Sequence, residues 1–163
     1  MTRVQVLIGD LDAAIERLRR ASDEDERRRA LTGALVELYR LRCHREGGRP
    51  LNQAHWNRAA AQRSGRVAQG ISLIRGDMTH HVVKEIEPER RPLYPGNDVF
   101  PGPDLYPGKQ LFWRYVSDMT PPHVLNQNDP RYLDYDQVVG GQPVLPTLVL
   151  ARDFLVADPG PCL

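Results

Sequence analysis

The residues of this sequence whose types and spacing could carry out chemistry lie close together, between Arg75 and His81. This segment contains a guanidinium (Arg75), a carboxylate (Asp77) and two imidazoles (His80 and His81). A guanidinium binds two phosphate oxygens in a planar fork, and an imidazole, whose pKa is near neutrality, can accept or donate a proton. The combination suits cleavage of a phosphodiester bond, in which negative charge develops on the non-bridging oxygens.

The spacing Arg-x4-His from Arg75 to His80, or Arg-x5-His to His81, resembles the signature of the HEPN superfamily of small helical-bundle proteins. The resemblance covers roughly residues 6–90, with the motif late in the bundle. It implies a metal-independent endoribonuclease of a toxin or phage-defence system, whose site forms at a dimer interface, although other members only bind. Arg75 would contact the scissile phosphate, and His80 or His81 would move the proton of the attacking 2′-hydroxyl. Gly76 departs from the family pattern, in which a polar residue usually follows the arginine; here Asp77 comes one place later.

Helix geometry limits how these side chains can meet. In a continuous helix, Arg75 and His80 would point about 140° apart, at roughly 100° per residue. They can act on one phosphate only if the helix breaks at Gly76-Asp77, or if two copies meet across a two-fold axis. The resemblance to the HEPN superfamily implies the second arrangement, a homodimer, and RNA as the ligand. We expect no cofactor or metal, because adjacent histidines diverge on a helix and no other metal-ligand spacing supports them.

Apolar periodicity predicts an antiparallel helical bundle over residues 6–90. The first helix spans about Val6 to Ala21, and the second runs from Ser22, its expected N-cap, to about His44. The third pattern starts after Asn52 and continues to about Glu87, either as one long helix or as two helices broken near Ser64-Gly65 or Gly76-Asp77.

The chain changes character after Arg91, because 12 of its 14 prolines lie in residues 92–163. Proline interrupts regular helices, so we expect an irregular, ordered wrap over the bundle. Within it we predict a strand near residues 110–116, with Leu111, Trp113 and Tyr115 on one face, a short helix or turn at residues 136–139, and a C-terminal helix near residues 146–157. The predicted class is mainly α, as one domain over residues 1–163.

Charge is distributed unevenly along the chain. Residues 1–91 contain 18 basic and 13 acidic side chains, a net of +5, whereas residues 92–163 contain 4 and 8, a net of −4. The run of arginines at residues 27–29 is most simply a solvated, partly self-paired surface, with an RNA-binding patch as the alternative. His55 and His123 stand apart from other ligand types, which is typical of surface or turn residues.

Other features bound the class of protein. Cys43 and Cys162 provide neither a disulfide framework nor zinc spacing. No apolar run approaches the ~20 residues of a membrane helix, so we expect a cytoplasmic protein without a membrane partner.

Two functions stay open from the sequence. The first is the HEPN-like ribonuclease. The second is a non-catalytic helical protein, such as an antitoxin, an immunity protein or a phage-associated accessory protein, which binds a protein partner through its Pro-rich segment. In that case Arg75 and Asp77 would form a structural ion pair beside solvated histidines.

Overall fold

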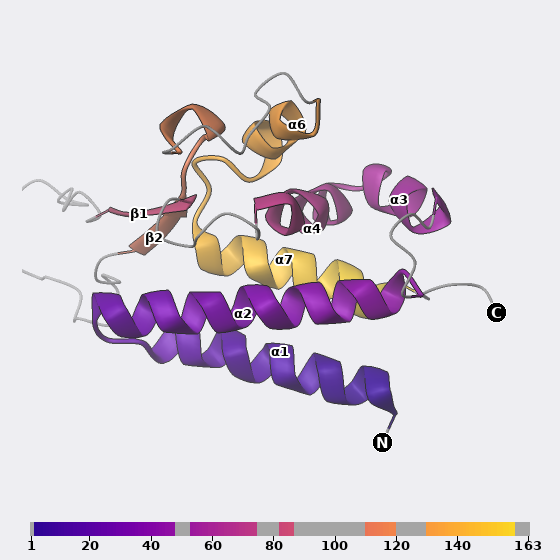
Figure 1. The fold of residues 1–163 in the computed structure, drawn as a ribbon, viewed down its shortest axis with the longest axis horizontal. Coiled ribbons are helices and arrows are strands. Elements are labelled where there is room, and N and C mark those ends of the chain that lie inside the picture. Colours follow the sequence, from indigo (N-terminus) through magenta and orange to yellow (C-terminus); the bar gives the residue numbers. More distant parts are fainter. Residues whose placement is uncertain (1, 48–52, 75–81, 87–109, 120–129, 159–163) are drawn as a thin grey trace, which may run out of the picture.

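The computed structural model describes residues 2–47, 53–74, 82–86, 110–119 and 130–158. These residues are mainly helical with one small sheet, which confirms the predicted class (Figure 1). The α-helices are α1 (Arg3–Arg20), α2 (Glu24–Arg45), α3 (Gln53–Ala60), α4 (Arg63–Ile74), α6 (Pro130–Val138) and α7 (Val144–Ala157). The strands are β1 (Val83–Ile86) and β2 (Gln110–Trp113), followed by the 3-10 helix η2 (Val116–Asp118).

Helices α1 and α2 form an antiparallel hairpin along one side of the molecule (Figure 1). A capping box starts α1, because the Thr2 hydroxyl accepts a bond from the Gln5 backbone while the Gln5 side chain accepts one from the Thr2 backbone. The N-cap of α2 is Asp23, one residue after the expected Ser22. Ser22 instead donates its backbone N–H and its hydroxyl to Glu26. The hairpin is therefore the one predicted, with its second helix shifted by one residue.

The prediction of one long helix from Asn52 to Glu87 is wrong, and the two-helix alternative is closer. The chain turns at Ala61 and Gln62, two to three residues before the expected break, and α4 ends at Ile74. A Cβ on Gly65 would overlap the backbone of Ala59, so glycine permits α4 to start this close to α3. Val83–Ile86, which helical periodicity had included, form strand β1.

Strands β1 and β2 pair antiparallel, with Val83 opposite Trp113 and Ile86 opposite Gln110. The strand prediction near residues 110–116 is confirmed for its first half, where Leu111 and Trp113 are buried. It is wrong for Tyr115, which lies beyond the strand and is 43% exposed. The buried Trp113 indole donates a 2.5 Å hydrogen bond to the Thr147 hydroxyl, which joins β2 to α7.

Helix α7 lies at the centre of the bundle. It starts two residues before the predicted position, with Pro146 in its first turn, and α6 includes the short helix expected near residues 136–139. Leu148, Ala151 and Leu155 are fully buried, and α7 contacts α1, α2, α4 and β2 (Figure 1). The C-terminal helix is thus a core element. The Pro-rich stretch expected to wrap the bundle falls largely on residues 87–109 and 120–129, outside the described residues.

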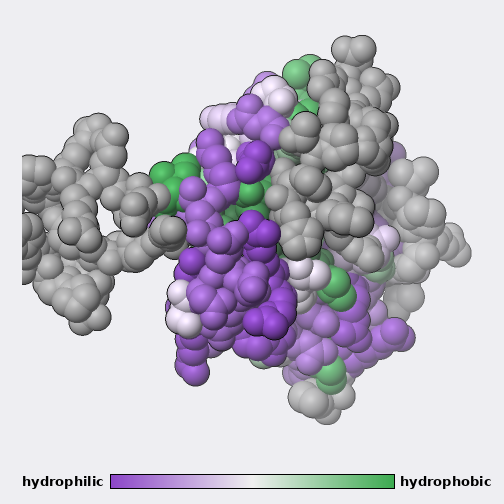
Figure 2. Space-filling view, turned by 60° about the vertical axis from the view of Figure 1, so that its left-hand side comes forward, coloured by the Kyte–Doolittle hydropathy of each residue, from purple (hydrophilic) through white to green (hydrophobic). Residues whose placement is uncertain are grey.

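The described surface in Figure 2 is mostly hydrophilic, and its hydrophobic residues appear in separate spots. The large apolar side chains that stay exposed are Val6, Val36, Ile86, Tyr115, Leu133 and Leu150. Isolated apolar residues of this kind are normal on protein surfaces.

Candidate functional site

The four residues with predicted chemistry, Arg75, Asp77, His80 and His81, lie outside the described residues. The structure describes both ends of this segment. On one side α4 ends at Ile74, and on the other Val82 immediately precedes β1. Ile74 and Val82 are both fully buried in the hydrophobic core. The segment from Arg75 to His81 therefore connects two points that are fixed by core packing.

Close packing holds the helix before the segment. In α4, Ile71 and Ile74 have no exposed surface. Gly70 faces α6 so closely that a Cβ there would stand 3.0 Å from a methyl group of Val139 and 3.4 Å from the ring of Tyr135. Because a larger residue at position 70 would push these helices apart, the end of α4 has little freedom to move.

Arg114 holds the strand after the segment, and nothing in the sequence singled it out. Its backbone N–H donates to the carbonyl of Val82 at 2.8 Å, and its Nε donates to the carbonyl of Val83 at 3.1 Å. The Tyr135 hydroxyl in turn donates to the Arg114 carbonyl at 2.9 Å. Burial raises the pKa of Tyr135 well above its ordinary value, so this hydroxyl stays protonated and remains a donor.

A half-buried ion pair also reaches β1. Arg27 at the start of α2 binds Glu85 through Nε at 2.9 Å and through Nη2 at 2.8 Å, and the two side chains are 16% and 18% exposed. The expectation that Arg27 belongs to a solvated arginine surface is therefore wrong. Arg28, in contrast, pairs with Glu24 one turn earlier on its own helix, as the self-paired interpretation predicted.

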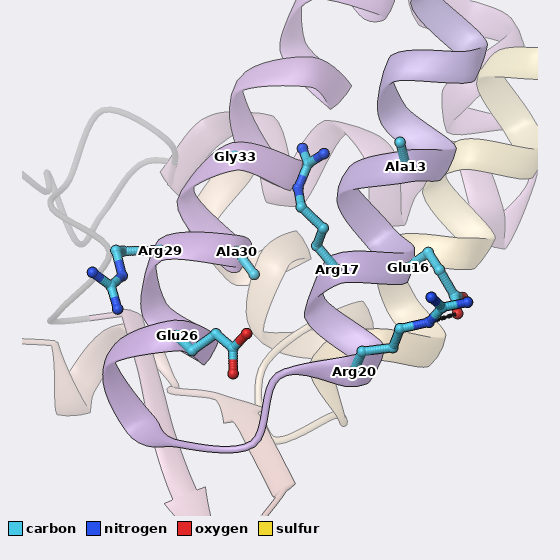
Figure 3. Close-up of a pocket in the computed structure, with 8 residues that line it drawn as sticks. All are labelled: Ala13, Glu16, Arg17, Arg20, Glu26, Arg29, Ala30 and Gly33. Carbon is cyan, nitrogen blue, oxygen red and sulfur yellow. Dashed lines mark hydrogen bonds and ion pairs between the residues drawn. The ribbon is translucent and has the colours of Figure 1, made fainter.

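The described surface has a groove of about 610 Å³ between α1 and α2 (Figure 3). Its small residues are Ala13, Ala30 and Gly33, and its charged ones are Glu16, Arg17, Arg20, Glu26 and Arg29. Arg17 extends between the two helices, Arg20 lies beside Glu16 on α1, and Arg29 stands at the outer edge of α2 (Figure 3).

The two carboxylates of this groove already have partners. Glu16 binds Arg19 at 2.6 Å and Arg20 at 2.7 Å, and the hydrogen bond from Arg20 lowers the pKa of Glu16. Glu26 accepts bonds from the backbone and the hydroxyl of Ser22. Arg17 and Arg29 have no ion pair or hydrogen bond within the described part of the chain. The groove therefore presents cationic groups that are available to a ligand.

A second group of charged residues is buried at the opposite end of the bundle. His55 Nδ1 lies 2.5 Å from Asp158 Oδ2, and Arg58 donates to the other oxygen of Asp158 at 2.8 Å. Glu46 accepts two bonds from Arg42, and its Oε1 lies 3.8 Å from His55 Nε2. The expectation that His55 is a surface or turn residue is wrong, because it is 1% exposed. His123 lies outside the described residues.

This buried cluster is suited to holding the fold together. Glu46, His55 and Asp158 are each at most 5% exposed, so a substrate has no access to them. Arg42 also covers the ring of Trp56, with its guanidinium carbon 5.1 Å from the ring centroid. Within the ranges that the structure describes, no three His, Cys, Asp or Glu side chains are grouped to hold a metal ion. The cluster neutralises charges where α2, α3 and the end of α7 meet.

Searches against protein-family models, curated proteins and solved structures found no match for this chain. Among the described helices, none combines the length and the apolar character that crossing a membrane requires.

Proposed function

We propose that this protein is a HEPN-like, metal-independent endoribonuclease of a toxin or phage-defence system, with Arg75 and His80 as its principal reacting groups. One observation carries the proposal. The Arg-x4-His segment lies between Ile74 and Val82, which are both fully buried in a mainly helical bundle. Packing of these two flanking residues in the core would hold both ends of the segment in place.

The proposed chemistry follows from the residue types. The ribose 2′-oxygen attacks phosphorus and forms the P–O2′ bond, while the P–O5′ bond breaks. His80 or His81 accepts the proton of the 2′-hydroxyl, and a protonated imidazole returns a proton to the leaving 5′-oxygen. Arg75 binds the non-bridging oxygens as their negative charge grows. The products are a 2′,3′-cyclic phosphate end and a 5′-hydroxyl end.

The proposal includes a homodimer. The 140° separation of Arg75 and His80 applies only to a continuous helix. Either a break at Gly76-Asp77 or a second copy of the chain can bring a guanidinium and an imidazole to one phosphate. In the second case, activity depends on protein concentration. Mixing an Arg75→Ala chain with a His80→Ala chain should then restore part of the activity.

The decisive experiment is RNA cleavage by the purified full chain in EDTA. We expect cleavage that persists without divalent cations, produces 2′,3′-cyclic phosphate ends and stops when the 2′-hydroxyl is replaced by hydrogen. We expect His80→Ala to reduce the rate about 100-fold or more, as for the loss of a general base. His44→Ala, on helix α2, serves as the matched control and should cleave normally.

Intact RNA after incubation with the folded wild-type protein would contradict this proposal. So would equal cleavage rates in the wild type and in a His80→Ala/His81→Ala double variant. Either result would favour the non-catalytic function, in which the chain binds a protein partner. Growth and RNA integrity in bacteria that express the wild type or His80→Ala give the same comparison in cells.

A further inference from the structure

Small side chains leave space at the base of the groove between α1 and α2. Ala13, Ala30 and Gly33 provide this floor, and a Cβ placed on Gly33 would meet no atom within 4 Å. Helices that pack in this way have axes ~8–10 Å apart, and the lining residues, from Ala13 to Arg20 and from Glu26 to Gly33, place the groove at the end of the hairpin near its turn. Its place between the two helices suits an extended chain.

The groups that a ligand would meet are guanidiniums. Arg17 lies between the two helices, and Arg29, which also lines the groove, stands on the outer side of α2 (Figure 3). Neither has a partner among the described residues, whereas Glu16 and Glu26 are both already bonded. An unpaired guanidinium in a groove favours an anion whose oxygens match its planar fork, which phosphate does.

We infer that this groove binds the phosphodiester backbone of single-stranded RNA, with Arg17 and Arg29 as the principal contacts. The inference rests on the proposed function, because it names where the RNA strand lies outside the Arg75–His80 segment. A charged groove that tracks the backbone is a general way to hold a single strand. Since no aromatic side chain is among the lining residues, the groove offers no base stacking and should bind without sequence preference.

An acidic protein segment is the main competing ligand, and the lining argues against it. Protein interfaces derive most of their affinity from large apolar or aromatic anchors at their centre. This groove is lined by alanine, glycine, arginine and glutamate alone. Val6 and Val36, which are about 40% exposed on the same two helices, are not among its lining residues. A surface with three arginines, two glutamates and no apolar anchors suits a phosphate backbone better than a folded partner.

The test measures binding separately from cleavage. Fluorescence anisotropy of a labelled single-stranded oligoribonucleotide is followed with the full-length His80→Ala/His81→Ala chain as the background. We expect Arg17→Gln and Arg29→Gln each to weaken binding at least 3-fold, and the double variant at least 10-fold. The slope of log K against log salt should fall by about 1.4 in the double variant, since each phosphate contact contributes roughly 0.7.

Two further variants sharpen the test. Arg63→Gln removes the same charge from an exposed position at the start of α4, outside the groove, and should change binding less than 2-fold. Gly33→Glu places a carboxylate in the open floor without a steric clash and should weaken binding at least 10-fold. Circular dichroism during heating verifies that each variant stays folded.

The outcomes separate this inference from the proposed function. Binding that depends on Arg17 and Arg29, together with a folded wild-type chain that does not cleave RNA, would support the groove and contradict the ribonuclease. Cleavage by the wild type together with unchanged binding in the Arg17/Arg29 double variant would overturn the groove alone. The groove inference is also wrong if the background chain binds no RNA at low salt, or if polyglutamate competes as strongly as unlabelled RNA.

Discussion

Asp158 is a buried carboxylate with charged partners on both of its oxygens. One oxygen contacts His55 at 2.5 Å and the other accepts bonds from Arg58, while the Asp158 backbone N–H closes the end of α7 on Phe154. His55 also packs against the Phe154 ring, with the ring centroids 5.7 Å apart. Removal of one charge from such a cluster leaves the others buried without compensation.

We therefore expect Asp158→Asn to lower the free energy of unfolding by about 3 kcal/mol, as for other buried pairs that lose one partner. Urea denaturation followed by circular dichroism measures the change. The matched control is Asp153→Asn, which neutralises an exposed carboxylate of α7 that pairs with Nη1 of Arg152 at 2.9 Å. Its effect should stay below about 1 kcal/mol. Equal effects of the two variants would show that the buried cluster adds nothing to stability.

Asp136 makes the stability of the fold depend on pH. Its carboxylate accepts a 2.8 Å hydrogen bond from the Val116 backbone. Burial raises the pKa of Asp136 above its ordinary value of 3.8, and the negative charge of Asp118 raises it further, whereas the Val116 bond lowers it. A carboxyl group with a raised folded-state pKa favours folding below pH 3.8, and this contribution is lost as pH rises through the folded pKa.

The expected result for Asp136→Asn is a difference in stability from the wild type that depends on pH. Relative to the wild type, the variant should gain stability as pH rises from below 3.8 toward neutrality, because only the wild type then ionises. Urea midpoints at several pH values measure this difference. A difference between Asp136→Asn and the wild type that does not vary with pH would contradict the argument.

At the scale of elements, the junction of α3 and α4 depends on Gly65. A Cβ at this position would overlap the Ala59 backbone, which cannot yield as a flexible side chain would. We expect Gly65→Ala to destabilise the protein by about 1–3 kcal/mol, the range for overpacked sites. Gly9→Ala, in α1, would meet no atom within 4 Å and should stabilise the protein by about 0.5–1 kcal/mol. Thermal denaturation of both variants measures these changes in stability. A Gly65→Ala protein more stable than the wild type would contradict the predicted steric overlap with Ala59.

Local patterns in the sequence predicted most elements, because a helix needs only neighbours three and four residues away. The α1–α2 hairpin, β2, the helix at residue 138 and α7 were all predicted near their observed positions. β1 was missed. Val83 and Ile86 fit a helical spacing as well as a strand, and the choice was made by Trp113 and Gln110, which pair with them from the distant strand. A four-residue strand carries too little periodicity to reveal itself without its partner.

At the scale of the whole molecule, α7 closes the core. Leu148 is fully buried in this helix, while Leu150, two residues later, is 37% exposed. We expect Leu148→Ala to cost about 2–5 kcal/mol, as for other large-to-small core substitutions. Leu150→Ala should cost less than about 1 kcal/mol. Urea denaturation of the two variants measures both values, and similar losses would show that α7 is not the central helix.

A fragment of residues 1–91 tests whether the other helices can fold without α7. Without α7, buried residues of α1, α2 and α4 such as Leu11, Leu41 and Ile74 would lose part of their packing. We expect the fragment to lack a cooperative urea transition, which the full chain should show. Cooperative unfolding of the fragment would instead support an independent helical bundle over residues 6–90.

The sequence by itself determined the helical class, the approximate limits of most helices and the one segment with a phosphodiesterase-like set of side chains. These features depend on local periodicity and on residue type. Only the tertiary structure decided that α7 lies at the centre, that Val83–Ile86 pair as a strand, that His55 is buried against a carboxylate 103 residues away, and that Arg17 and Arg29 line one groove. Each of these depends on contacts between residues far apart in the chain. Such contacts leave no periodic trace in a single sequence, because they are fixed by how the helices pack.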